Sequence, residues 1–446
     1  MKAEEIGALR AAVAGDVVGA ADVTYDELRN IFVHQGRPEV IVRCTSNDDV
    51  RAAIRFALDH ELVISVRSGG HSNAGFSTND GGMVIDLTPL DQVEIIDAEN
   101  SVVRLGSGAR WGAVASALGE HGLVISSGDT STVAVGGLLL GGGIGWLVRK
   151  FGLAIDNVVG AEVVTASGEV LRADAEENPE LFYGIRGGSG NFGVVTSFDV
   201  VAQKVPGVHF GTINYPADET AAVVKGWADY MRTAPPELTT TVGVFPPFDG
   251  VPTPVNLTVC YAGTDAAEAE AAIAPLRRLG TLLAADVKPV PYAAVLNEPS
   301  QLPPGWQPMV KSSFAPVAGP EFIDTVLTGA RQFAMLYVEF RSMGGAVREV
   351  AEDATAFAYR DDEIMFFTTH LGGPEDHQRI ETEFRDFWRT LAPFSHGAYS
   401  GFMSAVDEDD VAAIYPTATR ARLAALKAVH DPTNVFRLNP NVRPSK

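Results

Sequence analysis

The sequence predicts an α+β fold with two domains, on three observations. First, the chain has 446 residues, more than one ordinary core holds. Second, a βαβ pattern opens the chain and glycine-rich motifs follow it. Third, from about residue 205 predicted strands alternate with helices, which indicates an antiparallel sheet backed by helices. Because motifs of the first type return near the C-terminus, we expect residues 1–204 and 397–446 to form one discontinuous domain and residues 205–396 to form the second.

Hydrophobic patterning predicts the elements in order. In the first domain we expect strands at 40–43, 63–67, 83–87, 93–97 and 102–105, a hairpin at 161–172 and a strand at 194–200. Helices are expected after Asn47 or Asp48, with Val50, Ile54 and Leu58 on one face, and at 111–118 and 179–183. In the second domain the pattern predicts strands near Phe210, Val242, Leu257, Tyr337 and Phe366 and helices near Ala222, Ala271, Ile323 and Phe384.

The first glycine motif ends a predicted strand. Residues 64–72 read Ile-Ser-Val-Arg-Ser-Gly-Gly-His-Ser. Paired glycines allow several backbone N–H groups to approach one ligand, such as a pyrophosphate, because no Cβ obstructs them. The adjacent His71 can act as a base, a metal ligand or a nucleophile. The alternative is a turn histidine that makes one hydrogen bond.

Two further glycine clusters follow. Residues 128–145 read Gly-Asp-Thr-Ser-Thr-Val-Ala-Val-Gly-Gly-Leu-Leu-Leu-Gly-Gly-Gly-Ile-Gly, and the apolar spacer indicates a buried segment instead of a flexible linker. A third cluster contains a formal G-x-G-x-x-G at Gly188, Gly190 and Gly193. A Rossmann site requires a strand before this motif and a helix after it, whereas here the predicted order is the reverse.

Together the motifs resemble those of the FAD-linked oxidases of the vanillyl-alcohol oxidase and p-cresol methylhydroxylase (PCMH) superfamily, in its berberine-bridge-like branch. The resemblance is strong in the glycine motifs and loose between about residues 204 and 396. Further motifs that carry it are Phe151-Gly152-Leu153, Asp156-Asn157, Tyr415, Arg422-Leu423, Lys427, Asp431-Pro432, Asn434-Val435-Phe436 and Asn439-Pro440-Asn441. The resemblance implies a PCMH-type FAD-binding fold and an oxidase whose second domain covers the flavin.

The resemblance also implies that the ring of His71 is bonded to the C8 methyl carbon of FAD; noncovalent FAD is the alternative. Relatives with a second link have a cysteine at the position of Thr130. A threonine hydroxyl is too weak a nucleophile, so we expect a single attachment. The expected cofactor-binding residues are His71, Arg67, Ser68, Gly69, Gly70, Ser72, Gly75, Thr132, Val133, Val135, Gly136, Gly137, Gly141, Gly142, Gly143, Gly145, Asn157, Gly193, Val194, Val195, Tyr415, Asn439 and Asn441.

The chain departs from the family pattern at three positions. Leu138 replaces a histidine that often supports the flavin, and Phe402 replaces the tyrosine that serves many relatives as a base. In relatives the position of Val133 governs access of oxygen, and a small side chain there favours an oxidase. Simple core packing of Val133 is the alternative.

Candidate substrate residues follow from strand alternation. Tyr337, Glu339 and Arg341 share one strand face, and Phe366, Thr368 and His370 share another. Either set can line the pocket or belong to packing or a solvated face. We assign Tyr337, Glu339, Arg341, Phe366 and Thr368 to the substrate and Tyr399, Phe402 and His370 to the catalytic site.

The missing base favours hydride transfer from a small amine or alcohol. A neutral amine can release a hydride without a protein base, because its nitrogen lone pair stabilises the product. Oxidation of a hydroxyl group in a sugar or polyketide-type metabolite, with Tyr399, Tyr337 or His370 as the base, is the alternative. A redox-neutral flavin-dependent cyclase would keep the same glycine motifs.

Composition limits the partners. A net charge of −22 argues against nucleic acid. No stretch is apolar enough to span a bilayer, and residues 1–5 lack the pattern of a secretory signal, so we expect a cytoplasmic protein. Cys44 and Cys260 are too few for a disulfide framework or a thiolate metal site. The expected partners are a small-molecule substrate and O2.

Overall fold

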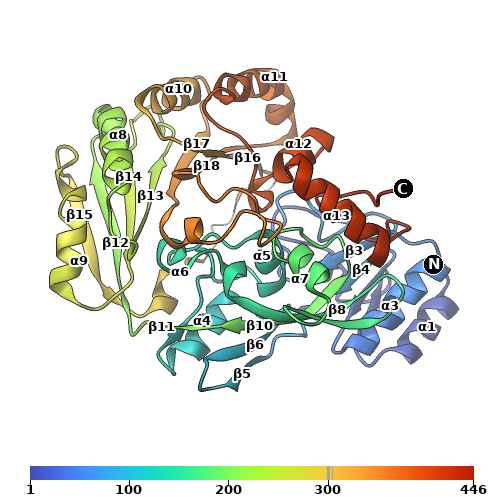
Figure 1. The fold of residues 1–446 in the computed structure, drawn as a ribbon. Coiled ribbons are helices and arrows are strands. Elements are labelled where there is room, and N and C mark those ends of the chain that lie inside the picture. Colours follow the sequence, from blue (N-terminus) through green and yellow to red (C-terminus); the bar gives the residue numbers. More distant parts are fainter. Residues whose placement is uncertain (299–301, 304) are drawn as a thin grey trace.

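The computed structural model describes residues 1–298, 302–303 and 305–446. It is built in two layers (Figure 1): a four-stranded and a five-stranded sheet with their helices lie below, together with the short pair β11-β7, and a seven-stranded sheet with its helices lies above. The α+β class that the sequence predicts is confirmed.

The first sheet has the order β1-β2-β4-β3, in which β2, β4 and β3 are parallel and β1 is antiparallel. Helix α3 begins after Ser46, whose hydroxyl accepts a hydrogen bond from Asp49 N at 3.2 Å. Val50 and Ile54 are buried as predicted, but Leu58 is 45% exposed, and Ala57 is buried instead. The elements of this region are α1 (Ala3–Ala12), β1 (Asp16–Gly19), α2 (Tyr25–Leu28), β2 (Val40–Arg43), α3 (Asn47–Asp59), β3 (Ile64–Arg67) and β4 (Met83–Asp86).

The second sheet is antiparallel, with the order β5-β6-β10-β8-β9. The predicted hairpin is present as β8 and β9. Helix α5 was not predicted, because three of its seven residues are glycines. The elements are β5 (Val93–Asp97), β6 (Val102–Gly106), α4 (Trp111–Gly119), β7 (Leu123–Val124), α5 (Val135–Gly141), α6 (Val148–Phe151), β8 (Val158–Val164), β9 (Val170–Asp174), α7 (Pro179–Ile185), β10 (Val194–Val201) and β11 (Gln203–Lys204).

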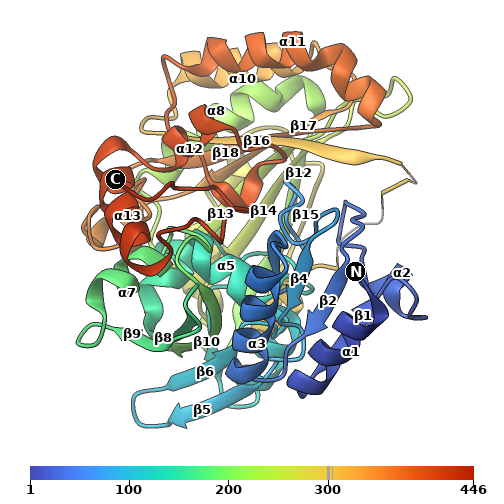
Figure 2. The same cartoon turned by 90° about the vertical axis from the view of Figure 1, so that its right-hand side faces the viewer.

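The third sheet, the lid sheet, is antiparallel in the order β15-β12-β14-β13-β17-β18-β16. Figure 2 shows α8, α10 and α11 on its outer face. Helix α11 holds Phe384, Phe387, Trp388 and Leu391 against the sheet, at the spacing of one helix face. The elements are β12 (Val208–Tyr215), α8 (Thr220–Met231), β13 (Leu238–Val244), β14 (Val255–Tyr261), α9 (Ala266–Ile273), β15 (Ala284–Val290), β16 (Gln307–Ala315), α10 (Pro320–Ala330), β17 (Leu336–Ser342), β18 (Ile364–Gly372) and α11 (Pro374–Leu391).

The five predicted strands of this sheet are present as β12, β13, β14, β17 and β18, and the four predicted helices as α8 to α11. Strands β15 and β16, which form the two edges of the sheet, were missed. Strand β15 carries Asp286, Lys288 and Pro289, and this polar, proline-containing pattern does not predict a strand.

The C-terminal helix α12 (Glu408–Ile414) lies beside β16, where Lys311 pairs with Asp410 at 3.4 Å, and helix α13 (Thr417–His430) leads back toward the lower layer (Figure 1). Helix α13 packs against α7, where Arg422 pairs with Glu180 at 2.7 Å. The buried Lys427 ammonium donates to Asn191 O at 2.7 Å, just before β10. These contacts hold the C-terminal segment against α7 and the start of β10; the division into a discontinuous first domain and a second domain stays a prediction. In the part of the chain that the structure describes, no helix combines the length and apolarity needed to cross a bilayer.

Candidate active site

A cavity of about 400 Å³ lies between the lower layer and the lid sheet. One wall, the glycine wall, is formed by residues 68–72 and 133–141. The opposite side, the ceiling, is formed by Arg341 of β17 and by residues 399–402. Further lining comes from the segments around residues 127–130, 189–195 and 436–440 and from Phe32, Ile64, Val66, Asn73, Phe76, Ser77, Leu87 and Ile144.

The glycine wall depends on close backbone packing. A Cβ on Gly69 would lie 2.7 Å from Ala134 N, and Gly70 has a φ of +71°. Only glycine fits the first position without backbone movement and adopts the second without strain. The strand end after β3 and the loop before α5 can therefore lie side by side.

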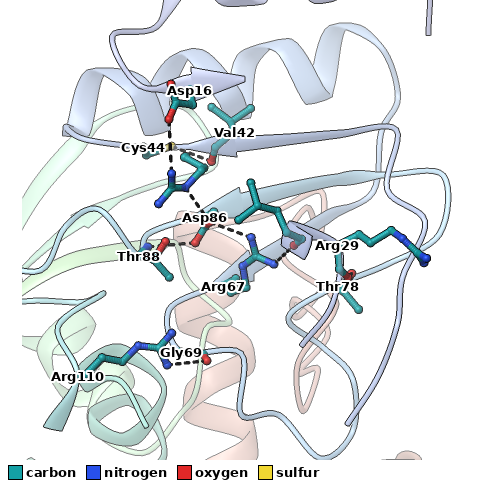
Figure 3. Close-up of polar contacts among 12 residues, drawn as sticks. Asp16, Arg29, Val42, Cys44, Arg67, Gly69, Thr78, Asp86, Thr88 and Arg110 are labelled. Atoms are coloured by element: carbon teal, nitrogen blue, oxygen red, sulfur yellow. Dashed lines mark hydrogen bonds and ion pairs between the residues drawn. The ribbon is translucent and has the colours of Figure 1, made fainter. Parts of the chain in front are cut away.

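The buried Arg67 and the half-buried Arg110 fix this wall from behind (Figure 3). Arg110 Nη1 donates to Gly69 O at 2.9 Å and also to Thr132 O. Arg67 Nη2 pairs with Asp86 at 2.8 Å, which ties the ends of β3 and β4 together. Arg67 thus supports the wall without lining the cavity.

His71 lies at the end of the wall. Its Nε2 is 3.0 Å from Thr132 Oγ1, and its ring stacks on Phe32 with the ring centroids 4.8 Å apart. Burial, assisted by the nearby Arg110 charge, lowers the pKa of His71 to about 4. The imidazole is therefore neutral at pH 7. Among the described residues, none forms a hydrogen bond with Nδ1, and in the tautomer whose Nε2–H donates to Thr132 the Nδ1 atom carries a lone pair.

The ceiling carries a buried charged network. Arg341 Nε donates to Glu339 at 2.6 Å, and Arg341 Nη2 donates to Asp129. Tyr337 OH donates to the other oxygen of Glu339 at 2.5 Å. Burial raises the pKa of Glu339. Burial also opposes ionisation of Asp129, but the paired Arg341 outweighs it, and the pKa of Asp129 is lowered.

Tyr399 and Phe402 complete the ceiling. Tyr399 OH accepts a hydrogen bond from Gly143 N at 3.1 Å, and burial raises its pKa. Phe402 stacks on Phe367, with the ring centroids 4.6 Å apart. The Arg341 guanidinium lies 4.9 Å from the centroid of the Phe402 ring. Phe402 thus offers an apolar face where the relatives' base is expected.

Comparison with known proteins agrees with this geometry. The FAD binding domain family matches residues 38–174. The (R)-6-hydroxynicotine oxidase of Paenarthrobacter nicotinovorans is 31% identical over 456 residues, which cover 97% of each chain. This chain belongs to the FAD-linked oxidases of the vanillyl-alcohol oxidase and PCMH superfamily. The family resemblance that the sequence motifs indicate is thereby confirmed.

Solved structures of FAD-linked oxidases share the whole fold. The 6-hydroxy-D-nicotine oxidase of Arthrobacter nicotinovorans has a TM-score of 0.86 and 28% identity, covering 97% of this chain and 98% of its own. The glucooligosaccharide oxidase of Acremonium strictum, which carries a 6-S-cysteinyl, 8α-N1-histidyl FAD, has a TM-score of 0.85 at 23% identity, with 99% of each chain covered. At that identity the second likeness shows the fold alone.

The residues of this FAD-linked oxidase fit FAD at the cavity. Gly137 has open space where a Cβ would lie, so its backbone is exposed to a ligand. At the far side, the side-chain oxygens of Asn439 and Asn441 are buried and have no partner among the described residues. A buried acceptor without a donor is destabilising. The N–H and O–H groups of a flavin nucleotide would satisfy such acceptors.

The expected cofactor residues fall into two groups, those that line the cavity and those that do not. Those that line the cavity are Ser68, Gly69, Gly70, His71, Ser72, Val133, Gly137, Gly141, Gly193, Val194, Val195 and Asn439. Those that do not line it are Arg67, Gly75, Thr132, Val135, Gly136, Gly142, Gly143, Gly145, Asn157, Tyr415 and Asn441. Thr132 and Tyr415 act through a neighbour, since they contact His71 and the lining residue Ser189 at 3.0 and 3.1 Å.

Asn157 is not among the residues that line the cavity. Its Nδ2 donates to Phe151 O at 3.0 Å and to Leu153 O at 3.2 Å, and its Oδ1 accepts from Gln203 at 2.8 Å. These bonds hold the turn after α6. The expectation that Asn157 contacts the cofactor is therefore corrected to a structural role.

Three residues assigned to the substrate or to catalysis face away from the cavity. Phe366 stacks on Trp388, and Thr368 Oγ1 accepts a hydrogen bond from Trp388 Nε1 at 3.3 Å. His370 contacts His377 of α11. Because neighbouring strand residues alternate, Met365 and Phe367 face the cavity side instead. The assignments of Phe366, Thr368 and His370 are therefore corrected: these residues belong to the helix-side core.

Of the other strand face, only Arg341 lines the cavity; Tyr337 and Glu339 hold it in place. Asp129 and Phe32 both line the cavity but were not predicted from the sequence. Asp129 could have been found as the one acidic residue within the glycine-rich segment 128–145. Phe32 lies in a loop with no distinguishing pattern.

Proposed function

We propose that this FAD-linked oxidase holds FAD through one covalent bond to His71 and oxidises a small amine or alcohol, with O2 as the electron acceptor and H2O2 as the product. Bound FAD supplies the hydride acceptor. The observation that carries the proposal is the environment of His71: a neutral imidazole at the cavity, with Nε2 engaged by Thr132 and Nδ1 free. A neutral imidazole is the nucleophilic form.

A single attachment is supported by the other lining residues. Thr130 lines the cavity, and its hydroxyl donates to Asp129 at 2.9 Å. Cys44 is buried in the core of the first sheet, and Cys260 of the lid strand β14 is buried against the core of the second sheet; burial raises the pKa of both thiols far above the ordinary value. No thiolate therefore borders the cavity among the described residues.

The lining also supports a small substrate with an apolar body. Leu138, Ile144 and Phe402 line the cavity, and Phe402 offers no proton acceptor. A neutral amine needs none for hydride release, because its lone pair stabilises the resulting iminium. Val133, which also lines the cavity, leaves room for the approach of O2.

The attachment is tested on the purified protein. Flavin should precipitate with the polypeptide in acid, and peptide mapping should place it on His71 alone. Release of all the flavin into the acid supernatant would disprove covalent attachment.

The chemistry is tested by anaerobic bleaching of the flavin across a panel of small amines and alcohols, followed by air and an assay for H2O2. We expect amines to bleach the flavin, and air to restore its colour with one H2O2 per substrate. A panel that leaves the flavin oxidised while substrate is consumed would instead indicate the redox-neutral cyclase.

Oxidation of a sugar or polyketide hydroxyl is the second candidate, favoured by one observation. Tyr399 lines the cavity, and its phenolate would accept the proton of an alcohol, although burial raises the pKa that this ionisation must overcome. Bleaching by sugars or other alcohols, but not by amines, would support this candidate.

A further inference from the structure

Arg341 retains hydrogen-bonding capacity at the ceiling of the cavity. Its Nε donates to Glu339 at 2.6 Å and its Nη2 to Asp129. Among the described residues, none accepts a hydrogen bond from Nη1. The side chain is 10% exposed, and Arg341 is a lining residue of the cavity. A guanidinium has five N–H donors, so Nη1 remains for a ligand.

The position of this donor is fixed. In the lid sheet Arg341 pairs with Thr241 of β13 on one side and with Met365 of β18 on the other. The guanidinium also lies 4.9 and 5.5 Å from the ring centroids of Phe402 and Phe367. A donor held in this way loses little conformational entropy when it binds a ligand.

The charge of Arg341 is already compensated. Its two contacts are carboxyl groups, and Asp129 faces the same cavity. Both oxygens of Glu339 accept hydrogen bonds, from Arg341 and Tyr337, as a carboxylate would. An anionic ligand at Nη1 would therefore lose its hydration and also meet the charge of Asp129. A neutral oxygen acceptor has less hydration to lose than an anion, and the Asp129 charge repels it less.

We infer that Arg341 determines specificity: its Nη1 donates to a neutral oxygen of the substrate, a hydroxyl or carbonyl, while Asp129 prevents the arginine from binding carboxylates. The inference deepens the proposed function, since it assumes that this cavity holds the substrate. It adds that an amine substrate carries such an oxygen besides its nitrogen.

The test uses two redox-inert probes with the same ring, benzamide and benzoate, in titration calorimetry of the FAD-containing protein at pH 8. We expect benzamide to bind at least about tenfold more tightly than benzoate. Asp129→Asn should strengthen benzoate binding by about tenfold and leave benzamide binding within about threefold, because a charge is removed while an acceptor for Arg341 remains. The double variant D129N/R341Q should then bind benzamide about tenfold more weakly than D129N does, because the donor is shortened.

Glu363→Gln is the matched control. Glu363 pairs with Arg232 at 2.8 Å elsewhere in the lid domain and is not a lining residue. It should leave both affinities unchanged, and thermal melts and flavin spectra of each variant should show a native fold. Stronger binding of benzoate than of benzamide by the unaltered protein would overturn the inference. An unchanged ratio in D129N, or no binding of either probe at millimolar concentration, would also overturn it.

The probes distinguish this inference from the proposed function. If benzamide and benzoate bind as expected but no amine or alcohol bleaches the flavin, the inference stands and the proposed oxidation fails. If amines bleach the flavin but benzoate is the preferred probe, only the inference fails.

Discussion

The glycine wall and the ceiling of the cavity present different chemistry to a ligand. The wall presents backbone atoms. A Cβ on Gly69 would clash with its neighbours, a side chain at Gly70 would be strained at a positive φ, and a Cβ on Gly137 would enter the cavity. The ceiling presents side chains, with Arg341, Tyr399 and Phe402 held by strand pairing and ring stacking. A backbone surface suits a group of constant shape such as a cofactor, whereas side chains can change with the substrate without altering the fold. The predictions below test this division of roles.

The largest effect is expected from His71→Ala at the end of the wall. Loss of the imidazole removes the nucleophile, so covalent flavin should fall from stoichiometric to none. Noncovalent FAD should still bind, because the substitution leaves the rest of the glycine wall and the lining around Asn439 unchanged. In-gel flavin fluorescence after denaturation measures the loss, and the absorbance of the native protein measures retained FAD.

The control for this substitution is His121→Ala, which removes an exposed imidazole after α4. It should keep the full covalent yield. Residual covalent flavin in His71→Ala would show a second attachment residue and contradict the single-link proposal.

The wall could be predicted from sequence because its determinants are contiguous. A strand, two glycines and a histidine lie within residues 64–71, and each property acts locally. Helix α5 could not be predicted, since its three glycines weaken a helix and one of them, Gly136, is required here by packing. A Cβ on Gly136 would lie 2.5 Å from Ser68 Oγ, a residue far away in sequence. Tertiary contact thus overrides helix propensity.

The second prediction compares two glycines of this wall. Gly69→Ala should destabilise the protein by about 1–3 kcal/mol, because the added Cβ meets the Ala134 backbone, which cannot rotate away. Gly137→Ala should leave stability unchanged or raise it by about 1 kcal/mol, as in any helix. Chemical denaturation of the flavin-free proteins measures both.

Flavin incorporation separates the two variants further. In Gly137→Ala the Cβ enters the cavity, so incorporation of FAD should fall although the fold is intact. If Gly137→Ala takes up FAD normally, the backbone of the wall does not contact the cofactor there.

The third prediction concerns pH. Burial lowers the pKa of His71 to about 4, so the reactive neutral form predominates well below the ordinary histidine range. The rate at which flavin-free protein becomes covalently flavinylated should therefore change by less than about twofold between pH 8 and pH 5. An ordinary imidazole would slow the reaction about thirtyfold over that range.

The same shift affects folding. Because the folded-state pKa is below the unfolded value, the unfolded chain binds the extra proton first, and His71 contributes stability above about pH 6.5 that is lost as the pH falls toward 4. In His71→Ala this part of the pH dependence should disappear. A flavinylation midpoint near pH 6.5 would contradict the buried environment.

The ceiling was harder to predict. Side chains alternate along a strand, and the sequence does not show which of the two alternating sets faces the cavity. Strand β17 alternates polar and apolar residues, whereas β18 begins with four apolar residues and continues with Thr368, Thr369 and His370, so no local pattern in β18 shows which way Thr368 faces. Helix α11, which supplies Trp388 to one face only, decides this orientation. That packing partner lies twenty residues from Thr368 and leaves no local signal.

The smallest effect is expected from Tyr399→Phe. The hydroxyl accepts one hydrogen bond, from Gly143 N at 3.1 Å, and its loss should lower stability by about 1 kcal/mol. If a neutral amine releases its hydride without a protein base, anaerobic flavin reduction should slow by less than about twofold. The rate should rise with pH and level off near the pKa of the substrate's own amine.

A loss of a hundredfold or more, with FAD still bound, would identify Tyr399 as a base and favour alcohol oxidation. In that case the ceiling would supply the proton acceptor as well as the specificity of the site.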